Sequence, residues 1–533
     1  MSASRKRTAS QVEESQGETS KRGPATTNKN RAQDGEMGDF EDEWEDEVDV
    51  DDETAPQETT DAQNGDDEDA MDVDVHPAVE DTEPSRDRQE GTEAFIPGKH
   101  TLSKDEVLEP DQSAYEMLHR MNVTWPCLSF DVLRDDLGDE RRKYPATAFV
   151  VTGTQAESSN KNEVLVMKMS SLHKTQKDDG DSDDDDDEDS DDEAALDEDA
   201  VLEYKSIPHT GGVNRVRAQP TAPSVTPIAS NQPYHVATWA ETGKVHIFNV
   251  NPLLTALAST SSTISDSAKK PVYTITAHGR AEGFAMDWAA SFGANNTTVS
   301  GLRLLTGDIA SKIYLTTTTV SGFNTSPTPF TSHTSSVEDL QWSPSEPTVF
   351  ASCSADRSIR IWDVRVKGRK SVMGVEGAHD SDVNVISWNR AKEASGYLMV
   401  SGGDEGAIKV WDLRGWNKPN QRPSPVATFN WHKAPITSVE WHPTDESAFV
   451  ASGSDEQVTI WDLSVEVDED EMGTSASSKT KSGDASLRDV PPQLLFVHQG
   501  QKDIKEVHWH PQIPGAVIST ALDGFNIFKT ISI

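Results

Sequence analysis

The stretch from Ser332 to Asp363 reads SHTSSVEDLQWSPSEPTVFASCSADRSIRIWD, and it decides the fold. Two short runs, 349–352 and 359–361, alternate in residue type with a period of two, which is typical of strands with two distinct faces. An aromatic-Pro turn at Trp342–Pro344 precedes the first run, and a turn at Asp356 separates the two runs. The stretch therefore predicts a small unit of β-strands that opens with His333 and closes with Trp362.

This order of His, turn, strand, turn and Trp resembles a WD repeat, which is one four-stranded blade of a β-propeller. In such repeats a His, a Ser, an Asp and a Trp form a hydrogen-bonded chain inside the blade, here His333, Ser352, Asp356 and Trp362. A Ser, His and Asp also suggest a catalytic triad. The trio recurs along the chain together with the Trp, and several copies of one nucleophile make little chemical sense. We therefore interpret these residues as structural.

Further copies of the repeat follow and precede this stretch. Two of them are regular, with His379, Ser401 and Trp411 in one and His432, Asp455 and Trp461 in the other. Degenerate copies begin at His209, His278 and His498, and another blade begins at Trp125. The sequence thus predicts an all-β fold, a seven-bladed propeller over residues 125–533. A strand near Trp125–Val132 is expected to pair with the last blade and close the ring.

Charge divides the chain into parts that can fold and parts that cannot. The 533 residues carry a net charge of −44, and only 34% of them are apolar. Acids are concentrated at 39–53 and 178–199, blocks without Lys or Arg. Such segments repel nucleic acids and anionic membranes and attract basic proteins. Two cysteines, and no apolar signal or spanning segment, predict an intracellular protein with no membrane role.

Residues 1–100 are predicted to form a disordered acidic tail with a basic tip, because they are rich in Ser, Thr, Asp, Glu and Pro. Arg5, Lys6 and Arg7, followed by Lys21 and Arg22, are typical of a two-part nuclear import signal. The alternative is a solvated basic tip without a receptor. We expect a nuclear and nucleolar protein, with shuttling through the cytoplasm left open.

Residues 101–124 are predicted to contain a docked N-terminal α-helix. In DQSAYEMLHRM (111–121), Ala114, Tyr115, Leu118 and Met121 have helical spacing, and Asp111 follows Pro110 as a candidate N-cap. A helix this short is marginal alone, so it should pack against the propeller.

The second acidic block is predicted to be a loop projecting from the first blade, because its charge density excludes a packed element. Its centre is Asp183, Asp184, Asp185, Asp186, Asp187, Glu188 and Asp189. Ser182 and Ser190 lie among carboxylates, the context favoured by acid-directed kinases, and phosphorylation there would add negative charge.

The segment YEMLHRMNV followed by WPCLSFDVL, ahead of a seven-blade pattern, resembles the WD-repeat branch that includes the retinoblastoma-associated histone-binding proteins. Within that branch, the acidic N-terminus and acidic loop are most similar to the glutamate-rich WD-repeat family, whose fungal counterpart is a ribosome-assembly chaperone. The resemblance covers residues 100–533. It implies a client, namely the universally shared third protein of the large ribosomal subunit, and delivery to preribosomes.

A second shared feature is the acidic and Pro-Pro loop at 465–493. In the histone-binding relatives a similar loop packs beside the N-terminal helix and forms a pocket for a basic histone helix. The resemblance carries over to Tyr115, Leu118, Glu466, Asp468, Glu469, Asp470, Glu471, Pro491 and Pro492. Here, 19 residues that include Lys479, Lys481 and Arg488 separate acids from prolines, so a groove for another basic segment, or a surface loop without a ligand, stays open.

No residues suggest catalysis, a metal or a cofactor. His508 and His510 invite a metal interpretation, but Trp509-His510-Pro511 repeats Trp441-His442-Pro443, which favours a turn residue. The glycines at 402–406 lack the strand-to-helix context of a phosphate loop. The leading hypothesis is a monomeric chaperone that covers a basic ribosomal protein until denser RNA charge displaces it, without binding nucleic acid directly. Alternatives are a histone chaperone or chromatin scaffold, a ubiquitin-ligase substrate receptor and, last, an enzyme.

Overall fold

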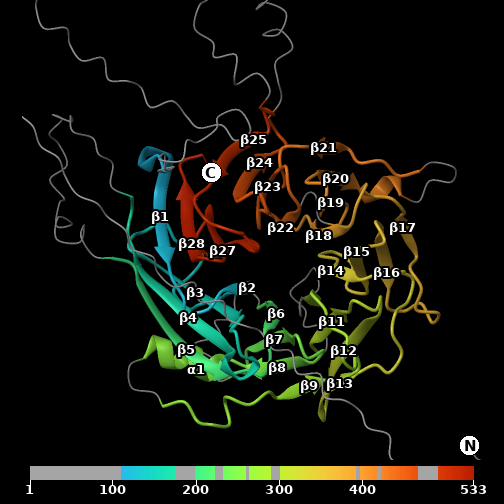
Figure 1. Cartoon of the computed structure of the whole chain (residues 1–533), viewed down its shortest axis with the longest axis horizontal. Coiled ribbons are helices and arrows are strands. Elements are labelled where there is room, and N and C mark those ends of the chain that lie inside the picture. Colours follow the sequence, from blue (N-terminus) through green and yellow to red (C-terminus); the bar gives the residue numbers. More distant parts are fainter. Residues whose placement is uncertain are drawn as a thin grey trace, which may run out of the picture. The chain divides into compact units, whose positions relative to one another are not determined.

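The computed structural model describes residues 110–175, 199–221, 232–259, 263–289, 301–391, 396–416, 422–465 and 490–532. They form seven four-stranded antiparallel sheets, and the inner strands of neighbouring sheets contact one another around a central channel (Figure 1). The predicted seven-bladed propeller is confirmed.

Blades 1 to 3 follow one another along the chain. Blade 1 contains β2 (Cys127–Leu133), β3 (Ala146–Thr154), β4 (Glu163–Leu172) and β5 (Val201–Pro208). Blade 2 contains β6 (Val213–Ala218), β7 (His235–Ala240), β8 (Val245–Asn249) and β9 (Tyr273–Ile275), and the helix α1 (Asn251–Ala258) follows β8. Blade 3 contains β10 (Ala285–Trp288), β11 (Arg303–Gly307), β12 (Ile313–Thr319) and β13 (Gly322–Thr325). Short 3-10 turns span Gln112–Ala114, Ser159–Lys161 and Leu413–Gly415.

Blades 4 to 6 contain the most regular repeats. Blade 4 contains β14 (Val337–Trp342), β15 (Val349–Ser354), β16 (Ile359–Asp363) and β17 (Met373–Val375). Blade 5 contains β18 (Val383–Trp388), β19 (Leu398–Gly403), β20 (Ile408–Asp412) and β21 (Ala427–Phe429). Blade 6 contains β22 (Ile436–Trp441), β23 (Ala448–Gly453), β24 (Gln457–Asp462) and β25 (Leu494–His498). Blade 7 contains β26 (Glu506–Trp509), β27 (Ala516–Ala521), β28 (Gly524–Thr530) and, as its outer strand, β1 (Tyr115–Met121).

The predicted hydrogen-bonded chains hold the regular blades together. In blade 4, His333 contacts Asp356 through Nδ1 (2.9 Å) and Ser352 through Nε2 (2.7 Å), and Trp362 Nε1 donates to Ser352 Oγ (2.8 Å). Blade 5 repeats this geometry with His379, Glu405, Ser401 and Trp411. Because the His, Ser and Trp of each chain are buried and every member is bonded, these residues are scaffold, as predicted.

Blade 6 uses a different hydroxyl. His432 Nδ1 contacts Asp455 at 2.8 Å, as predicted, but Thr459 Oγ1 both contacts His432 Nε2 (2.9 Å) and accepts from Trp461 Nε1 (2.8 Å). Thr459 lies on the third strand, whereas Ser352 lies on the second strand of blade 4. The same polar chain is therefore completed from two different strands.

The predicted N-terminal α-helix over 111–121 is wrong, because Gln112–Ala114 forms only a 3-10 turn and Tyr115–Met121 is strand β1, paired antiparallel with β28. Tyr115, Met117 and Met121 are buried, which is the period-2 pattern of a strand. The strand at Trp125–Val132 was expected to pair with the last blade. It is instead β2, the inner strand of blade 1, and β1 makes the closure. The expected tie between N-terminal and C-terminal sequence thus exists, one strand earlier.

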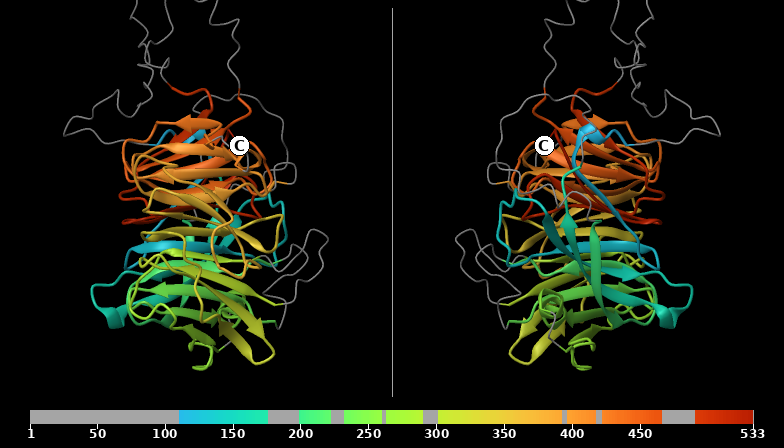
Figure 2. Two further views of the ribbon diagram at one scale, coloured as in Figure 1. Left: turned by 90° about the vertical axis from the view of Figure 1, so that its right-hand side faces the viewer. Right: turned by 90° about the vertical axis from the view of Figure 1, so that its left-hand side faces the viewer.

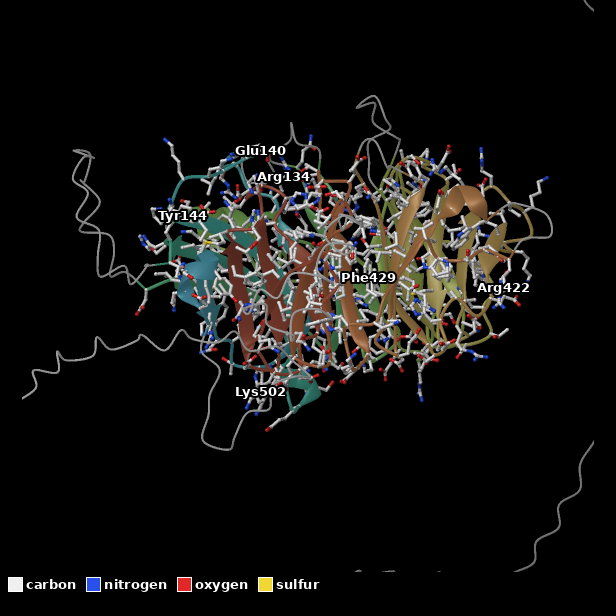
Figure 3. All side chains as sticks on the ribbon, turned by 90° about the horizontal axis from the view of Figure 1, so that it is seen from above. Arg134, Glu140, Tyr144, Arg422, Phe429 and Lys502 are labelled. Atoms are coloured by element: carbon white, nitrogen blue, oxygen red, sulfur yellow. The ribbon has the colours of Figure 1, made fainter. Side chains whose placement is uncertain are left out.

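The ring has two faces, which we name by residues of blade 4. Because the strands of a blade alternate in direction, the connection from the first to the second strand and the connection from the third to the fourth strand lie at the same face, the Pro344 face. The turn from the second to the third strand and the connection to the next blade lie at the opposite face, the Asp356 face. Seen edge-on, the strands run between these faces (Figure 2). Arg134 and Glu140, in a first-to-second connection, lie opposite Lys502, which precedes β26 (Figure 3). None of the described helices is long and apolar enough to cross a membrane.

Candidate functional site

Three acidic stretches of the sequence join the ring at the Pro344 face. The connection from β4 to β5 leaves the described residues at Thr175 and resumes at Asp199, and that from β24 to β25 leaves at Val465 and resumes at Val490. The N-terminal segment leads through Pro110 into β1, whose first residue pairs with the end of β28. The three junctions belong to blades 6, 7 and 1, which are consecutive around the ring.

The charge of the protein resides almost entirely in these stretches. The described residues contain 31 Lys and Arg and 36 Asp and Glu, a net charge of −5, whereas the whole chain contains 48 and 92. The remaining segments therefore hold 17 and 56, which is −39 of the total of −44. A nearly neutral ring is thus joined, at its Pro344 face, to segments of strongly negative charge.

Tyr115 stabilises the seam between blades 6 and 7. Its side chain is 4% exposed, its ring packs edge-on against Phe496 of β25 (5.3 Å between centroids), and its hydroxyl contacts His498 Nδ1 at 2.8 Å. Asn526 Nδ2 donates to His498 Nε2 at 3.0 Å, and Phe528 stacks on the His498 ring. Burial raises the pKa of the Tyr115 phenol, so Tyr115 remains a neutral hydrogen-bonding partner.

Pro491 and Pro492 lie where the acidic connection of blade 6 re-enters the ring. The Pro491 carbonyl accepts from Leu494 N (3.0 Å), which forms a turn into β25, and Pro492 is exposed. Gln493 Nε2 donates to the Val465 carbonyl at 3.0 Å, so both ends of the connection are held together. Leu118 of β1 is half-buried and packs, with Phe496, on the core cluster of blades 6 and 7. The structure thus brings Tyr115, Leu118 and the Pro-Pro segment to one seam. Their contact with a client stays a prediction.

Other predicted site residues lie outside the described part of the chain. They are the import signal (Arg5, Lys6, Arg7, Lys21, Arg22), the acids Asp183 to Asp189, the serines Ser182 and Ser190, and Glu466, Asp468, Glu469, Asp470 and Glu471.

The two histidines considered for a metal have other roles. His510 Nδ1 accepts hydrogen bonds from the backbone N–H groups of Gln512 and Ile513, both at 3.1 Å, which confirms a turn residue. His508 points into the central channel and contacts Glu440 at 3.0 Å. Among the described residues, no group of three or more His, Cys, Asp or Glu is arranged to hold a metal ion.

Sequence reasoning missed a ring of acids in the central channel. Asp131, Asp287, Asp339, Glu440 and Glu506 lie on the inner strands β2, β10, β14, β22 and β26. A weak signal was present, because the acid directly precedes Trp288 and Trp441 at the ends of their strands. The recurrence of an acid on the inner strand becomes visible only when the repeats are aligned on that strand.

Comparison with known proteins gives consistent results. A family model for the histone-binding protein RBBP4 and its counterpart in the CAF1 complex matches residues 105–173, and a WD-domain G-beta repeat model matches 324–363 and 423–462. The chain is 42% identical to ribosome assembly protein rrb1 of Schizosaccharomyces pombe over 499 residues, 94% of each chain. It is 43% identical to glutamate-rich WD repeat-containing protein 1 of Dictyostelium discoideum, covering 81% of this chain and 84% of the relative. It is 40% identical to Protein HEAT STRESS TOLERANT DWD 1 of Arabidopsis thaliana, covering 83% and 92%.

Proposed function

Because this chain belongs to the glutamate-rich WD-repeat family that includes ribosome assembly protein rrb1, we propose that it is a chaperone for a ribosomal protein. The 42% identity over nearly the full length of both chains supports a role in ribosome assembly. The proposed client is a newly made basic protein of the large subunit, the universally shared third one, which the chaperone delivers to preribosomes. The protein would act by binding rather than by catalysis.

The observation that carries this proposal is that the acidic stretches are all joined to the ring at one face. A free ribosomal protein bears Lys and Arg that later contact RNA, and carboxylates can cover them before assembly. The stretches 1–109, 176–198 and 466–489 have a net charge of −40, are joined to blades 7, 1 and 6 at the Pro344 face, and supply those carboxylates. The seam at Leu118, Phe496 and Pro492 offers apolar contacts beside them, and such contacts add selectivity that charge alone does not give.

A histone client is the second candidate, because the histone-binding family model matches residues 105–173, the region of β1 and blade 1. Purification of the protein from its own cells at moderate salt separates the two. We expect a large-subunit ribosomal protein among the retained partners. Core histones without any ribosomal protein would contradict the leading proposal.

Deleting residues 178–199 tests the contribution of charge. We expect weaker binding of the ribosomal protein and a shallower dependence of affinity on salt, because fewer counterions are exchanged. The melting temperature should stay nearly unchanged, because the deletion falls between β4 and β5. A matched control keeps the length and replaces every Asp and Glu of the segment by Asn and Gln. If this neutral segment restored binding, charge would not be the cause.

Nuclear import through Arg5, Lys6, Arg7, Lys21 and Arg22 is part of the proposal, since ribosome assembly begins in the nucleolus. Replacing these five residues by Ala in a fluorescent fusion should move the protein to the cytoplasm. An unchanged nuclear signal would exclude this import route.

A further inference from the structure

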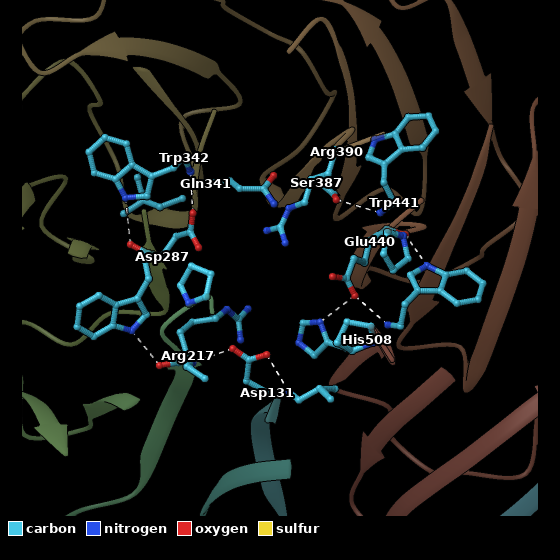
Figure 4. Close-up of a pocket in the computed structure, with 18 of the residues that line it drawn as sticks. Asp131, Arg217, Asp287, Gln341, Trp342, Ser387, Arg390, Glu440, Trp441 and His508 are labelled. Atoms are coloured by element: carbon cyan, nitrogen blue, oxygen red, sulfur yellow. Dashed lines mark hydrogen bonds and ion pairs between the residues drawn. The ribbon is translucent and has the colours of Figure 1, made fainter. Parts of the chain in front are cut away.

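The inner strands of the ring are joined by side chains that reach from one blade to the backbone of the next. Asp287 Oδ2 accepts from Trp342 N (2.7 Å), Asp339 Oδ2 from Ile386 N (3.1 Å), and Asp131 Oδ2 from Ala218 N (2.8 Å). Glu440 and Glu506 accept likewise from Trp509 N and Phe130 N. These five carboxylates are therefore fixed around the central channel (Figure 4).

Two of the five carboxylates have a cationic partner within the protein. Glu506 Oε1 pairs with Arg215 (2.6 Å) and Arg217 (2.7 Å), and Glu440 pairs with His508 (3.0 Å). Although burial lowers it, the pKa of His508 is raised to about 10 by Glu440 and Glu506, so His508 is protonated at neutral pH. The channel thus compensates these two negative charges itself.

The other three carboxylates form no close ion pair, although Arg217 lowers the pKa of each of them from a distance. Among the described residues, no Lys, Arg or His nitrogen lies within 4.0 Å of Asp131, Asp287 or Asp339. All three line a cavity of about 410 Å³ that extends to Pro344, Pro443 and Pro511, the turns of the Pro344 face. Burial raises the pKa of Asp287 to about 7, although the charges of Arg390 and Arg217 lower it.

The same cavity contains a hydrogen-bond donor without an acceptor. Trp342 Nε1 and Trp509 Nε1 donate to carbonyls of the preceding inner strands, those of Asp287 and Glu440. Trp441 occupies the equivalent place, is 2% exposed and lines the cavity, yet its Nε1 has no partner in the described structure. Leaving a buried N–H without a partner is unfavourable, so this site favours a ligand that brings a carbonyl.

Arg390 marks the position that a ligand cation would take. It follows β18, its side chain is exposed, and its guanidinium points into the cavity between Asp287 and Glu440 (Figure 4). It forms no hydrogen bond or ion pair with the described residues, although its charge lowers the pKa of both carboxyls. Arg390 therefore offsets the negative charge only from a distance.

We propose that this cavity binds one Lys or Arg side chain from an extended basic segment of the client protein. The cation would lie against Asp287 and Asp339, and a neighbouring peptide carbonyl would accept from Trp441 Nε1. The identity of the client rests on the proposed function, whereas the site rests on the channel geometry. The cavity and the acidic stretches share the Pro344 face, so one extended segment can engage both.

The test measures peptide binding to the full-length protein by fluorescence anisotropy. The probe is a fluorescent dodecapeptide of alternating Arg and Gly, and a Gln-Gly peptide serves for comparison. Titrations are made at about 150 mM salt, because close ion pairs are screened less than distant charges. The double substitution Asp287→Asn with Asp339→Asn keeps an acceptor for Trp342 N and Ile386 N, so the ring bonds persist. We expect about a 10-fold weaker affinity for the Arg peptide, the scale of one lost close charge pair. The matched control, Glu157→Gln with Asp380→Asn, removes two exposed acids at the Asp356 face and should change affinity less than twofold.

Two single substitutions test whether the cavity binds a cation together with a peptide carbonyl. Arg390→Gln removes the competing resident cation and should tighten binding of the Arg peptide about threefold, and Trp441→Phe should weaken it by a similar factor. Weaker binding after Arg390→Gln would overturn the proposal, because removing a competing cation cannot weaken a cation site. Unchanged binding by the Asp287/Asp339 variant, at an unchanged melting temperature, would also overturn it.

The experiments separate a failure of the proposed client from a failure of the proposed cation site. If the Asp287/Asp339 variant loses the Arg peptide but the wild-type protein retains no ribosomal protein from cells, the site stands and the proposed client is wrong. If the wild-type protein and the variant retain the ribosomal protein equally, the client stands and the cavity is not its site.

Discussion

The hydroxyl group of Ser352 forms hydrogen bonds with two buried rings, those of His333 and Trp362. Replacing Ser352 with Ala leaves His333 Nε2 and Trp362 Nε1 without partners, so we expect a loss of about 2–4 kcal/mol in the free energy of unfolding. In blade 6, Ala451 takes the place of Ser352, and Thr459 serves His432 and Trp461. The next residue, Ser452, is equally buried, but its hydroxyl bonds to Thr437 rather than to a His or Trp ring. Urea titrations should show a clearly smaller loss for Ser452→Ala. Equal losses would mean that the hydroxyl bridge contributes little.

His498 makes the seam between blades 6 and 7 sensitive to acid. Burial, aided by Arg120, lowers its pKa to about 3, so the unfolded chain takes up a proton first, below about pH 6.5. This contribution to stability is full above about pH 6.5 and declines by about 1.4 kcal/mol per pH unit until the folded pKa is reached. Protonation also gives Nε2 a hydrogen that opposes the Asn526 amide.

When the pH falls from about 7 to about 5, the free energy of unfolding of the wild-type protein should therefore decrease by about 2 kcal/mol more than that of the His498→Gln variant. Melting temperatures of both proteins at the two pH values measure this difference. Parallel losses would show that His498 does not titrate in this range.

Sequence patterns predicted the residues of a blade better than those of the channel. His333, Ser352, Asp356 and Trp362 follow from type and spacing, because each supplies one member of a chain that local turns bring together. Asp287 and Asp339 meet only when seven sheets close around an axis, and no local spacing encodes that. The missing acceptor of Trp441 Nε1 could not be predicted for the same reason, since the acceptors of the equivalent Trp342 and Trp509 belong to another blade.

Strand β1 shows how pairing overrides a local preference. Ala114, Tyr115, Leu118 and Met121 have helical spacing, yet Tyr115, Met117 and Met121 also fit the alternation of a strand. The free edge of β28, far along the chain, supplies backbone partners that a short isolated helix lacks. A single sequence therefore does not decide whether this segment forms a helix or a strand.

Two truncations test the role of β1. A protein that begins at residue 101 keeps β1 and should melt within a few degrees of the full chain. A protein that begins at residue 122 exposes the edge of β28 and the buried side chains around Met117, so it should melt far lower or aggregate. Scanning calorimetry and light scattering provide the measurement. Similar melting of the two proteins would show that β1 is an accessory strand.

The ring as a whole receives the three acidic stretches at junctions on its Pro344 face, which predicts that the point of attachment matters as well as charge. Moving residues 178–199 into the turn at Glu157 puts the same charge on the Asp356 face of the same blade. If the client is held at the Pro344 face, this graft should not restore the affinity lost on deletion, although the net charge is identical. Full restoration in binding titrations would mean that the acidic stretch acts only through its total charge.

Closure by β1 also orders events during translation. This strand leaves the ribosome before all other described strands of the ring, and its partner β28 leaves after them. The nascent chain must therefore keep β1 unpaired while six blades form, and only a chain read through to residue 530 can complete the seventh. A prematurely terminated product therefore leaves β1 and its last blade without strand partners, and such open edges favour aggregation.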